Sequence, residues 1–299
     1  MAGVAVLTDS TASLTPQTAT ALGIRVVPLR VAWEGVDAPD DADSRELLAA
    51  HLRAGGTATT SQPSRAALVE AMEEAVADGA RDLVCLHLSA ELSGTVGAAR
   101  QAGAEVGEQH GVAVHVVDTR TVAGGMAFAA VAAGRRAARG DDVAGVLAAA
   151  RETAARSHVL FAVPDLRHLA RGGRIGPARA LVGSALGARP VLVLRGGRLD
   201  VAETARGAAR TQRRIVELAV RAAGGPGAAS PRGEGGPVRV AVHHFADPAA
   251  ADELAGALEQ RLTETGAQVA DLVRSEVTAV VGAHTGPGVV GVALAPAPR

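Results

Sequence analysis

The chain has 299 residues, of which 48% are hydrophobic and 20% are charged. This apolar content is high enough to offset the entropy lost on folding, so disorder is excluded as the state of the whole chain. The 30 basic residues are balanced by 31 acidic ones, which leaves a net charge of −1. Because basic residues are not in excess, the charge gives no indication of a nucleic acid or an anionic membrane as the partner.

Several residue types are absent or rare, and each absence excludes a kind of chemistry. All basic residues are Arg, which removes the P-loop lysine and Schiff-base catalysis. The single cysteine, Cys85, cannot form an internal disulfide or a cysteine metal cluster, and it fits a reducing compartment. The N-terminus lacks the pattern of a signal peptide, and no apolar run is long enough for a transmembrane helix. We therefore expect a cytoplasmic protein without stable insertion into a membrane.

In the first half of the chain, short Val/Leu runs alternate with Ala-rich stretches of helical spacing. The predicted strands are Val4–Leu7, Ile24–Val31, Leu83–Leu88 and Val112–Val117. The predicted helices are Ser64–Ala77, Thr95–Gln109, Thr121–Arg139 and Val143–Arg156. Buried strands that alternate with helices indicate a parallel sheet covered on both faces. We expect residues 1–156 to form an N-terminal α/β domain.

The second half repeats the alternation and is expected to form a C-terminal α/β domain over residues 157–299. The predicted strands are His158–Val163, Pro190–Leu194, Val238–Val242, Gln268–Val273 and Val289–Leu294. The predicted helices are Glu203–Ala222 and Pro248–Thr265. Residues 224–237 are rich in Gly, Pro and Ser without periodicity, so they are expected to be a mobile surface loop.

Small polar residues follow three strands of the predicted first sheet. These segments are Asp9–Thr11, Ser89–Thr95 and Asp118–Thr119. The carboxyl ends of parallel strands meet at one edge, where ligands bind in open α/β sheets. Taken singly, each hydroxyl is better explained as a helix cap or a turn, so only their convergence indicates a site. The best candidates are Ser93, Gly94 and Thr95, because two hydroxyls flank a Gly at a helix N-terminus that favours anions.

Other polar clusters lie elsewhere in the sequence. Residues Thr59–Ser64 precede a helix, and Arg171–Gly176 place guanidinium groups on flexible backbone suited to a carboxylate or phosphate. His284 lies in a polar turn, where it either binds an anion or caps the turn. His243 and His244 are adjacent in a strand and point to opposite faces, so one is expected to be buried and the other exposed rather than both binding a metal.

Common catalytic motifs are missing from the sequence. There is no G-x-S-x-G or H-E-x-x-H, and the literal G-x-G-x-x-G at Gly286–Gly291 precedes a strand without a following helix. We therefore expect no catalytic residue, no cofactor and no metal site. A serine hydrolase that uses Ser93, His284 and Asp9 is the competing enzymatic hypothesis.

Eight motifs occur in an order that resembles the DegV family of fatty-acid-binding proteins, which includes the FakB subunit of bacterial fatty acid kinase. The resemblance runs from about residue 4 to residue 294. The motifs are DSTASL (Asp9–Leu14), TSQPS (Thr60–Ser64), LSGT (Leu92–Thr95), VVDT (Val116–Thr119), DLRHLARGGRIG (Asp165–Gly176), RPVL (Arg189–Leu192), TARG (Thr204–Gly207) and HTGPG (His284–Gly288).

The resemblance implies two α/β domains with a long-chain fatty acid in an apolar tunnel between them. By motif match, the carboxylate would be bound by Thr60, Ser61, Ser93, Gly94, Thr95 and His284. The basic residues implied near the head group or facing a kinase are Arg174, Arg189 and Arg206. The family often has Lys where Arg189 stands, and Asp-Gly where this chain has Gly196-Gly197, which puts any role of that Asp in doubt.

The function implied by the resemblance is that of a non-catalytic carrier, expected to be a monomer. It would present the bound fatty acid to an ATP-dependent kinase subunit, and the resulting acyl-phosphate would feed phospholipid synthesis. The alternative is a carrier of another hydrophobic carboxylate, a branched-chain acid or other lipid, without a kinase partner.

Overall fold

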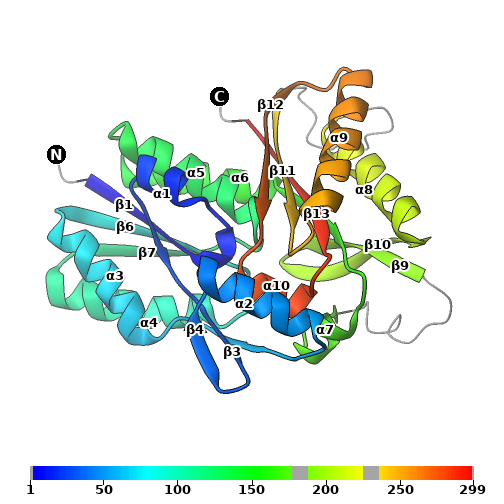
Figure 1. Cartoon of the computed structure of the whole chain (residues 1–299). Coiled ribbons are helices and arrows are strands. Elements are labelled where there is room, and N and C mark those ends of the chain that lie inside the picture. Colours follow the sequence, from blue (N-terminus) through cyan, green and yellow to red (C-terminus); the bar gives the residue numbers. More distant parts are fainter. Residues whose placement is uncertain (1–2, 177–187, 225–235, 298–299) are drawn as a thin grey trace.

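The computed structural model describes residues 3–176, 188–224 and 236–297, which form two α/β domains (Figure 1). The first contains a four-stranded parallel sheet in the order β2-β1-β6-β7. Its strands are β1 (Gly3–Asp9), β2 (Ile24–Val27), β6 (Ala80–His87) and β7 (Ala113–Asp118). The expected two-domain α/β class and the parallel first sheet are confirmed.

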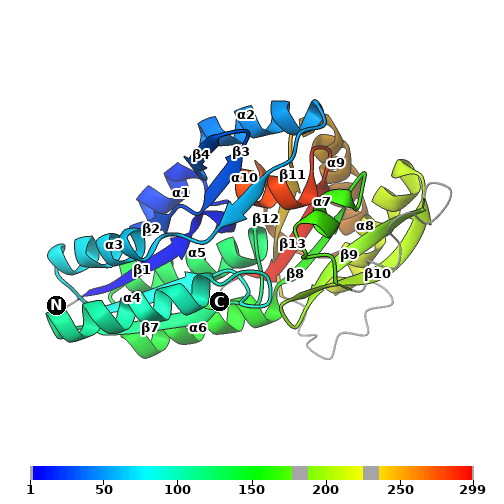
Figure 2. The ribbon, with the colours of Figure 1, turned by 90° about the horizontal axis from the view of Figure 1, so that it is seen from below.

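Helices cover both faces of the first sheet (Figures 1 and 2). They are α1 (Pro16–Ala21), α3 (Arg65–Ala77), α4 (Thr95–His110), α5 (Gly124–Ala138) and α6 (Val143–Arg156). Successive residues of β6 point to opposite faces, so Leu83 and Cys85 pack with α3 and α4, whereas Val84 and Leu86 pack with α5 and α6. Burying both faces explains why β6 reads as a continuous apolar run.

The second domain contains a six-stranded mixed sheet in the order β10-β9-β8-β13-β11-β12. Its strands are β8 (His158–Ala162), β9 (Ala188–Arg195), β10 (Arg198–Arg206), β11 (Val238–His244), β12 (Val269–Glu276) and β13 (Val290–Pro296). Only β11 and β12 pair in parallel. One face packs against α8 (Ala208–Ala222) and α9 (Pro248–Glu264), and the other packs against α5 and the first domain.

Several elements lie wholly or partly outside the sequence-based predictions. A three-stranded antiparallel sheet is inserted after β2, and three further helices complete the described part of the fold. These elements are β3 (Arg30–Trp33), β4 (Val36–Pro39), β5 (Thr59–Ser61), α2 (Ala42–Arg53), α7 (Arg167–Arg171) and α10 (Ala279–Thr285). Helix α2 packs against α10, so the inserted segment of the first half lies against the second domain (Figures 1 and 2).

Three predicted boundaries were wrong. The expected strand Ile24–Val31 is two strands, with Pro28, which has no N–H for a sheet ladder, between them. The expected helix Glu203–Ala222 begins only at Ala208, because the residues through Arg206 pair with β9. Helix α5 begins at Gly124 rather than at Thr121. The expected loop at 224–237 falls mainly on residues 225–235, outside the described residues.

Within the described ranges, no helix combines the length and the apolar character that crossing a membrane requires.

Candidate functional site

A cavity of about 390 Å³ lies between the domains and is lined by residues of both. This volume is within the range typical of small-molecule sites. Most of the wall is apolar and buried, and it includes Leu29, Leu88, Phe161, Leu169, Val280 and Val289. The polar lining residues include Thr60, Ser61, Gln62, Ser93, Gly94, Arg174 and His284, each of them half-buried or exposed. Buried polar residues, namely Thr11, His243 and Thr285, also line it, so a mainly apolar wall carries polar groups both near the surface and in the interior.

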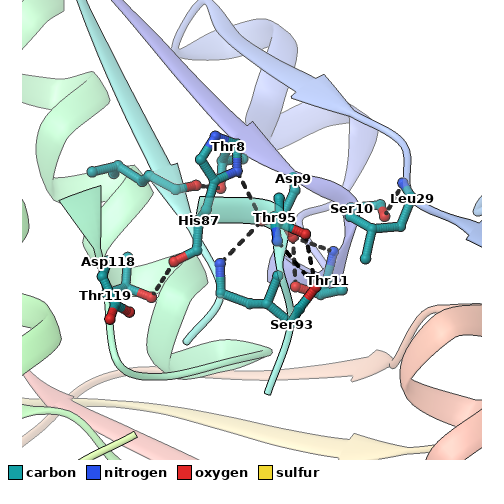
Figure 3. A network of polar contacts seen from close by, with 12 residues as sticks. Thr8, Asp9, Ser10, Thr11, Leu29, His87, Ser93, Thr95, Asp118 and Thr119 are labelled. Carbon is teal, nitrogen blue, oxygen red and sulfur yellow. Dashed lines mark hydrogen bonds and ion pairs between the residues drawn. The ribbon is translucent and has the colours of Figure 1, made fainter. Parts of the chain in front are cut away.

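The carboxylate of Asp9 fixes the carboxyl ends of β1 and β6 beneath this cavity (Figure 3). One oxygen accepts hydrogen bonds from the backbone N–H of Thr11 at 3.1 Å and from its hydroxyl at 2.5 Å. The other lies 3.0 Å from Nδ1 of His87 and accepts the N–H of Leu88 at 3.0 Å. Because Thr11 and Leu88 line the cavity, the predicted convergence of the strand ends is confirmed and contributes to its wall.

The hydroxyls of Ser93 and Thr95 lie at the start of α4, 2.9 Å apart (Figure 3). Ser93 and Gly94 line the cavity, whereas Thr95 is buried. The side chain of Gln62, from the segment after β5, lies over Gly94, where a Cβ would be 2.3 Å from its Oε1. The positive end of the α4 dipole therefore faces the polar part of the cavity.

The ring of His284 faces the same region from α10. Its Nε2 is hydrogen-bonded to Oγ1 of Thr60 at 2.8 Å. Gly172 packs against the opposite side of the ring, where a Cβ would lie 2.2 Å from Nδ1. Burial, assisted by the charge of Arg174, lowers the pKa of His284 to about 4. The imidazole is therefore neutral at pH 7 and offers one N–H donor and one acceptor.

Arg174 supplies a positive charge at the edge of the cavity. Its Nε donates to the carbonyl of Leu92 at 3.0 Å, and its guanidinium also donates to the carbonyl of Gly172. The side chain comes from the second domain and contacts the segment that carries Ser93. It therefore joins the two halves of the polar cluster and leaves a cation close to both hydroxyls and the imidazole.

This arrangement suits the binding of an anion with an aliphatic tail. Hydroxyls, an imidazole and a guanidinium are the donors that a carboxylate accepts from, and the apolar wall suits an alkyl chain. A serine hydrolase relay is not assembled among the described residues. Ser93 is hydrogen-bonded to Thr95, His284 to Thr60, and Asp9 to His87.

Six of the nine predicted site residues line this single cavity: Thr60, Ser61, Ser93, Gly94, Arg174 and His284. Thr95 lies beneath them. Arg189 is half-buried on β9 and Arg206 is exposed at the end of β10, and neither lines the cavity. His284 was expected in a turn, but it lies in the last turn of α10; the Gly that follows ends the helix.

His243 lines the cavity as well, although the sequence indicated only that one of two adjacent histidines would be buried. It is 7% exposed, its Nδ1 is 3.0 Å from Oγ of Ser275, and burial lowers its pKa to about 4. His244 is half-buried rather than exposed, and it also borders the cavity. The strand alternation was the only signal for His243, and it could not show that the buried face borders a cavity.

Comparison with known proteins shows which family this chain belongs to. The model of the family described as "Uncharacterised protein, DegV family" matches residues 3–297. A DegV domain-containing protein of Streptomyces coelicolor is 41% identical over 97% of this chain and 98% of its own length. The chain therefore belongs to the DegV family.

Two solved structures with the same fold are described as fatty-acid-binding. A DegV family protein from Thermus thermophilus, described by its fatty acid binding, superposes with a TM-score of 0.86 at 31% identity, over 99% of this chain and 100% of that chain. DegV of Bacillus subtilis, described as a fatty acid binding protein, gives a TM-score of 0.82 at 26% identity with the same coverage.

Proposed function

We propose that this protein binds a long-chain fatty acid, with the alkyl chain in the interdomain cavity and the carboxylate on the polar cluster. The observation that carries the proposal is one interdomain cavity, whose wall is mainly apolar and which gathers polar donors from both domains. Each buried methylene contributes about 0.8 kcal/mol, so a long chain supplies most of the affinity. The fatty acids bound by the two structurally similar family members support the same ligand class.

The roles of the polar residues follow from their positions. Thr60, Ser61, Ser93 and the backbone at Gly94 donate to the carboxylate, and the neutral imidazole of His284 holds the Thr60 hydroxyl in place for this contact. Thr95 holds the hydroxyl of Ser93 in place. A carboxylate placed in the apolar part of the cavity without such donors would be strongly disfavoured. These contacts therefore fix the orientation of the ligand, with its carboxylate at the polar cluster.

The carboxylate end of the ligand would lie near the surface, where a second protein can reach it. We propose that an ATP-dependent kinase subunit phosphorylates this carboxylate to an acyl-phosphate, which then feeds phospholipid synthesis. Arg174 lies at the edge of the cavity on the side of that partner, and Arg189 and Arg206 are proposed to face it. In this scheme the chain is a cytoplasmic, monomeric carrier, with the fatty acid as its ligand and no cofactor.

Two experiments separate these steps. Calorimetric titration with palmitic acid tests the carrier function, and one acid bound per chain is expected. Incubation of the loaded protein with a fatty acid kinase subunit and labelled ATP tests the second step, and labelled acyl-phosphate is expected. Binding without phosphorylation by kinases from related bacteria would keep the carrier and refute the kinase role. Failure to bind any straight-chain acid, with uptake of a branched one, would establish the alternative ligand class.

A further inference from the structure

At the N-terminus of helix α10, a backbone N–H donates a hydrogen bond to a side chain of the first domain. Its N-cap residue, Thr278, makes no side-chain capping bond. Instead, the carboxylate of Asp40, which lies between β4 and α2, accepts the N–H of Val280 at 3.0 Å. These residues are 240 positions apart in the sequence. A capping bond that a helix normally takes from its own cap residue is supplied here across the domain boundary.

The other oxygen of Asp40 is tied to the first sheet. It accepts the hydroxyl of Ser10 at 2.6 Å, and that hydroxyl in turn accepts the N–H of Leu29 at 3.1 Å. The side chain is 6% exposed, and burial raises its pKa, although the bonds from Ser10 and Val280 act in the opposite direction. Asp40 therefore links the end of β1 to the start of α10.

Helix α10 places four residues in the cavity wall: Val280, Val281, His284 and Thr285. It has only seven residues, so its own hydrogen bonds do little to hold it in place. Val280 and His284 are four residues apart, about one helical turn, so a small shift at the N-terminus is transmitted directly to the imidazole of His284. The distance between His284 and Thr60 therefore depends on where Asp40 holds the first turn.

We propose that Asp40 is a positioning residue for carboxylate recognition: by capping α10 from the first domain, it holds His284 against Thr60. The inference rests on the proposed function, since it assigns His284 to the carboxylate. It predicts that loss of the Asp40 carboxylate weakens recognition of the acid group more than it weakens binding of the alkyl chain.

The test compares palmitic acid with 1-hexadecanol, which has the same chain without a carboxylate. Asp40→Ala is expected to lower the affinity for the acid roughly tenfold, the effect of losing a hydrogen bond to a charged group, and to lower the affinity for the alcohol much less. Asp40→Asn keeps an acceptor for Val280 and is expected to retain most of the affinity. Asp142→Ala is the matched control, because it removes the N-cap of α6, which contributes no residue to the cavity.

A double-mutant cycle shows whether Asp40 acts through His284. In a His284→Ala background, Asp40→Ala is expected to cause little further loss of acid binding. An additive loss, or an equal loss for acid and alcohol, would overturn the proposal and leave Asp40 a purely structural cap.

Two readouts need no ligand. In Asp40→Ala, the amide of Val280 is expected to exchange with deuterium faster, and the ¹⁵N resonances of the His284 ring are expected to shift. Wild-type protein that binds neither acid nor alcohol would refute the proposed function alone. Unchanged Val280 exchange and His284 resonances would refute the role of Asp40, whatever the ligand is.

Discussion

The imidazole Nε2 of His284 lies 2.8 Å from the hydroxyl of Thr60, although 224 residues separate them in the sequence. Thr60 comes from the small inserted sheet of the first half, and His284 comes from α10 of the second. The polar cluster is therefore complete only when both halves of the chain are packed together.

His284→Ala is expected to weaken fatty acid binding by roughly tenfold or more, because the substitution removes the imidazole that holds the Thr60 hydroxyl in place for the carboxylate. Calorimetric titration with palmitic acid measures the effect. His110→Ala is the control, since His110 pairs with Glu73 on the surface outside the cavity. Equal affinities for both variants and the wild type would remove His284 from the site.

Gly172→Ala tests the packing behind the imidazole. The backbone at Gly172 has φ −70°, which Ala adopts without strain, but the new Cβ would lie 2.2 Å from Nδ1 of His284. The ring must move away from Thr60, so acid affinity is expected to fall several-fold while the protein stays folded. Gly97→Ala in α4 is the matched control, because a Cβ there meets no other atom within 4 Å. An unchanged affinity in Gly172→Ala would show that the position of the ring does not matter.

Acid is expected to destabilise the folded protein through two histidines. Burial lowers the pKa of His243 and of His284 to about 4, from an ordinary value of 6.5. Between these values the unfolded chain binds more protons, so the stabilisation is full above pH 6.5 and is lost as the pH falls towards 4. Each histidine accounts for a change of roughly 3 kcal/mol at most. The free energy of unfolding can be measured by urea titration at several pH values across this range. In His243→Gln it should depend less on pH than in the wild type. An equal pH dependence in both proteins would show that His243 is not a source of the acid sensitivity.

Val281→Phe tests whether the alkyl chain occupies the cavity. Val281 is a half-buried part of the wall, so a larger side chain there takes up ligand space with little strain on the core. The affinity for palmitic acid is expected to fall more than that for an eight-carbon acid, as competitive displacement of a fluorescent fatty acid would show. Val273→Phe, on an exposed site of β12, serves as the control. An equal loss for both chain lengths would place the chain elsewhere.

The fold class and the first sheet could be predicted because their signals are local. Runs such as Leu83–Leu88 are apolar throughout, which is typical of strands buried on both faces. Strand β10 could not be predicted, because it mixes polar and apolar residues and continues almost directly into α8. The inserted sheet was not predicted as a separate sheet, because its strands have only three or four residues, too few to show a period.

The site was predictable as a set of residues rather than as a geometry. Motif order indicated Thr60, Ser93 and His284, but nothing local to these segments showed that they meet. The cap from Asp40 to Val280 depends on two segments 240 residues apart, and in the sequence Asp40 stands directly before Asp41, the ordinary N-cap of α2. The cavity face of His243 likewise depends on the packing of α5 against the second sheet.

Native mass spectrometry of the purified protein, followed by solvent extraction and identification of the released compound, tests the central claim most directly. We predict one long-chain fatty acid per protein chain, or its stoichiometric uptake when palmitic acid is added to delipidated protein. Protein that carries no acyl compound and takes up none would contradict the assignment of the interdomain cavity as a fatty acid site.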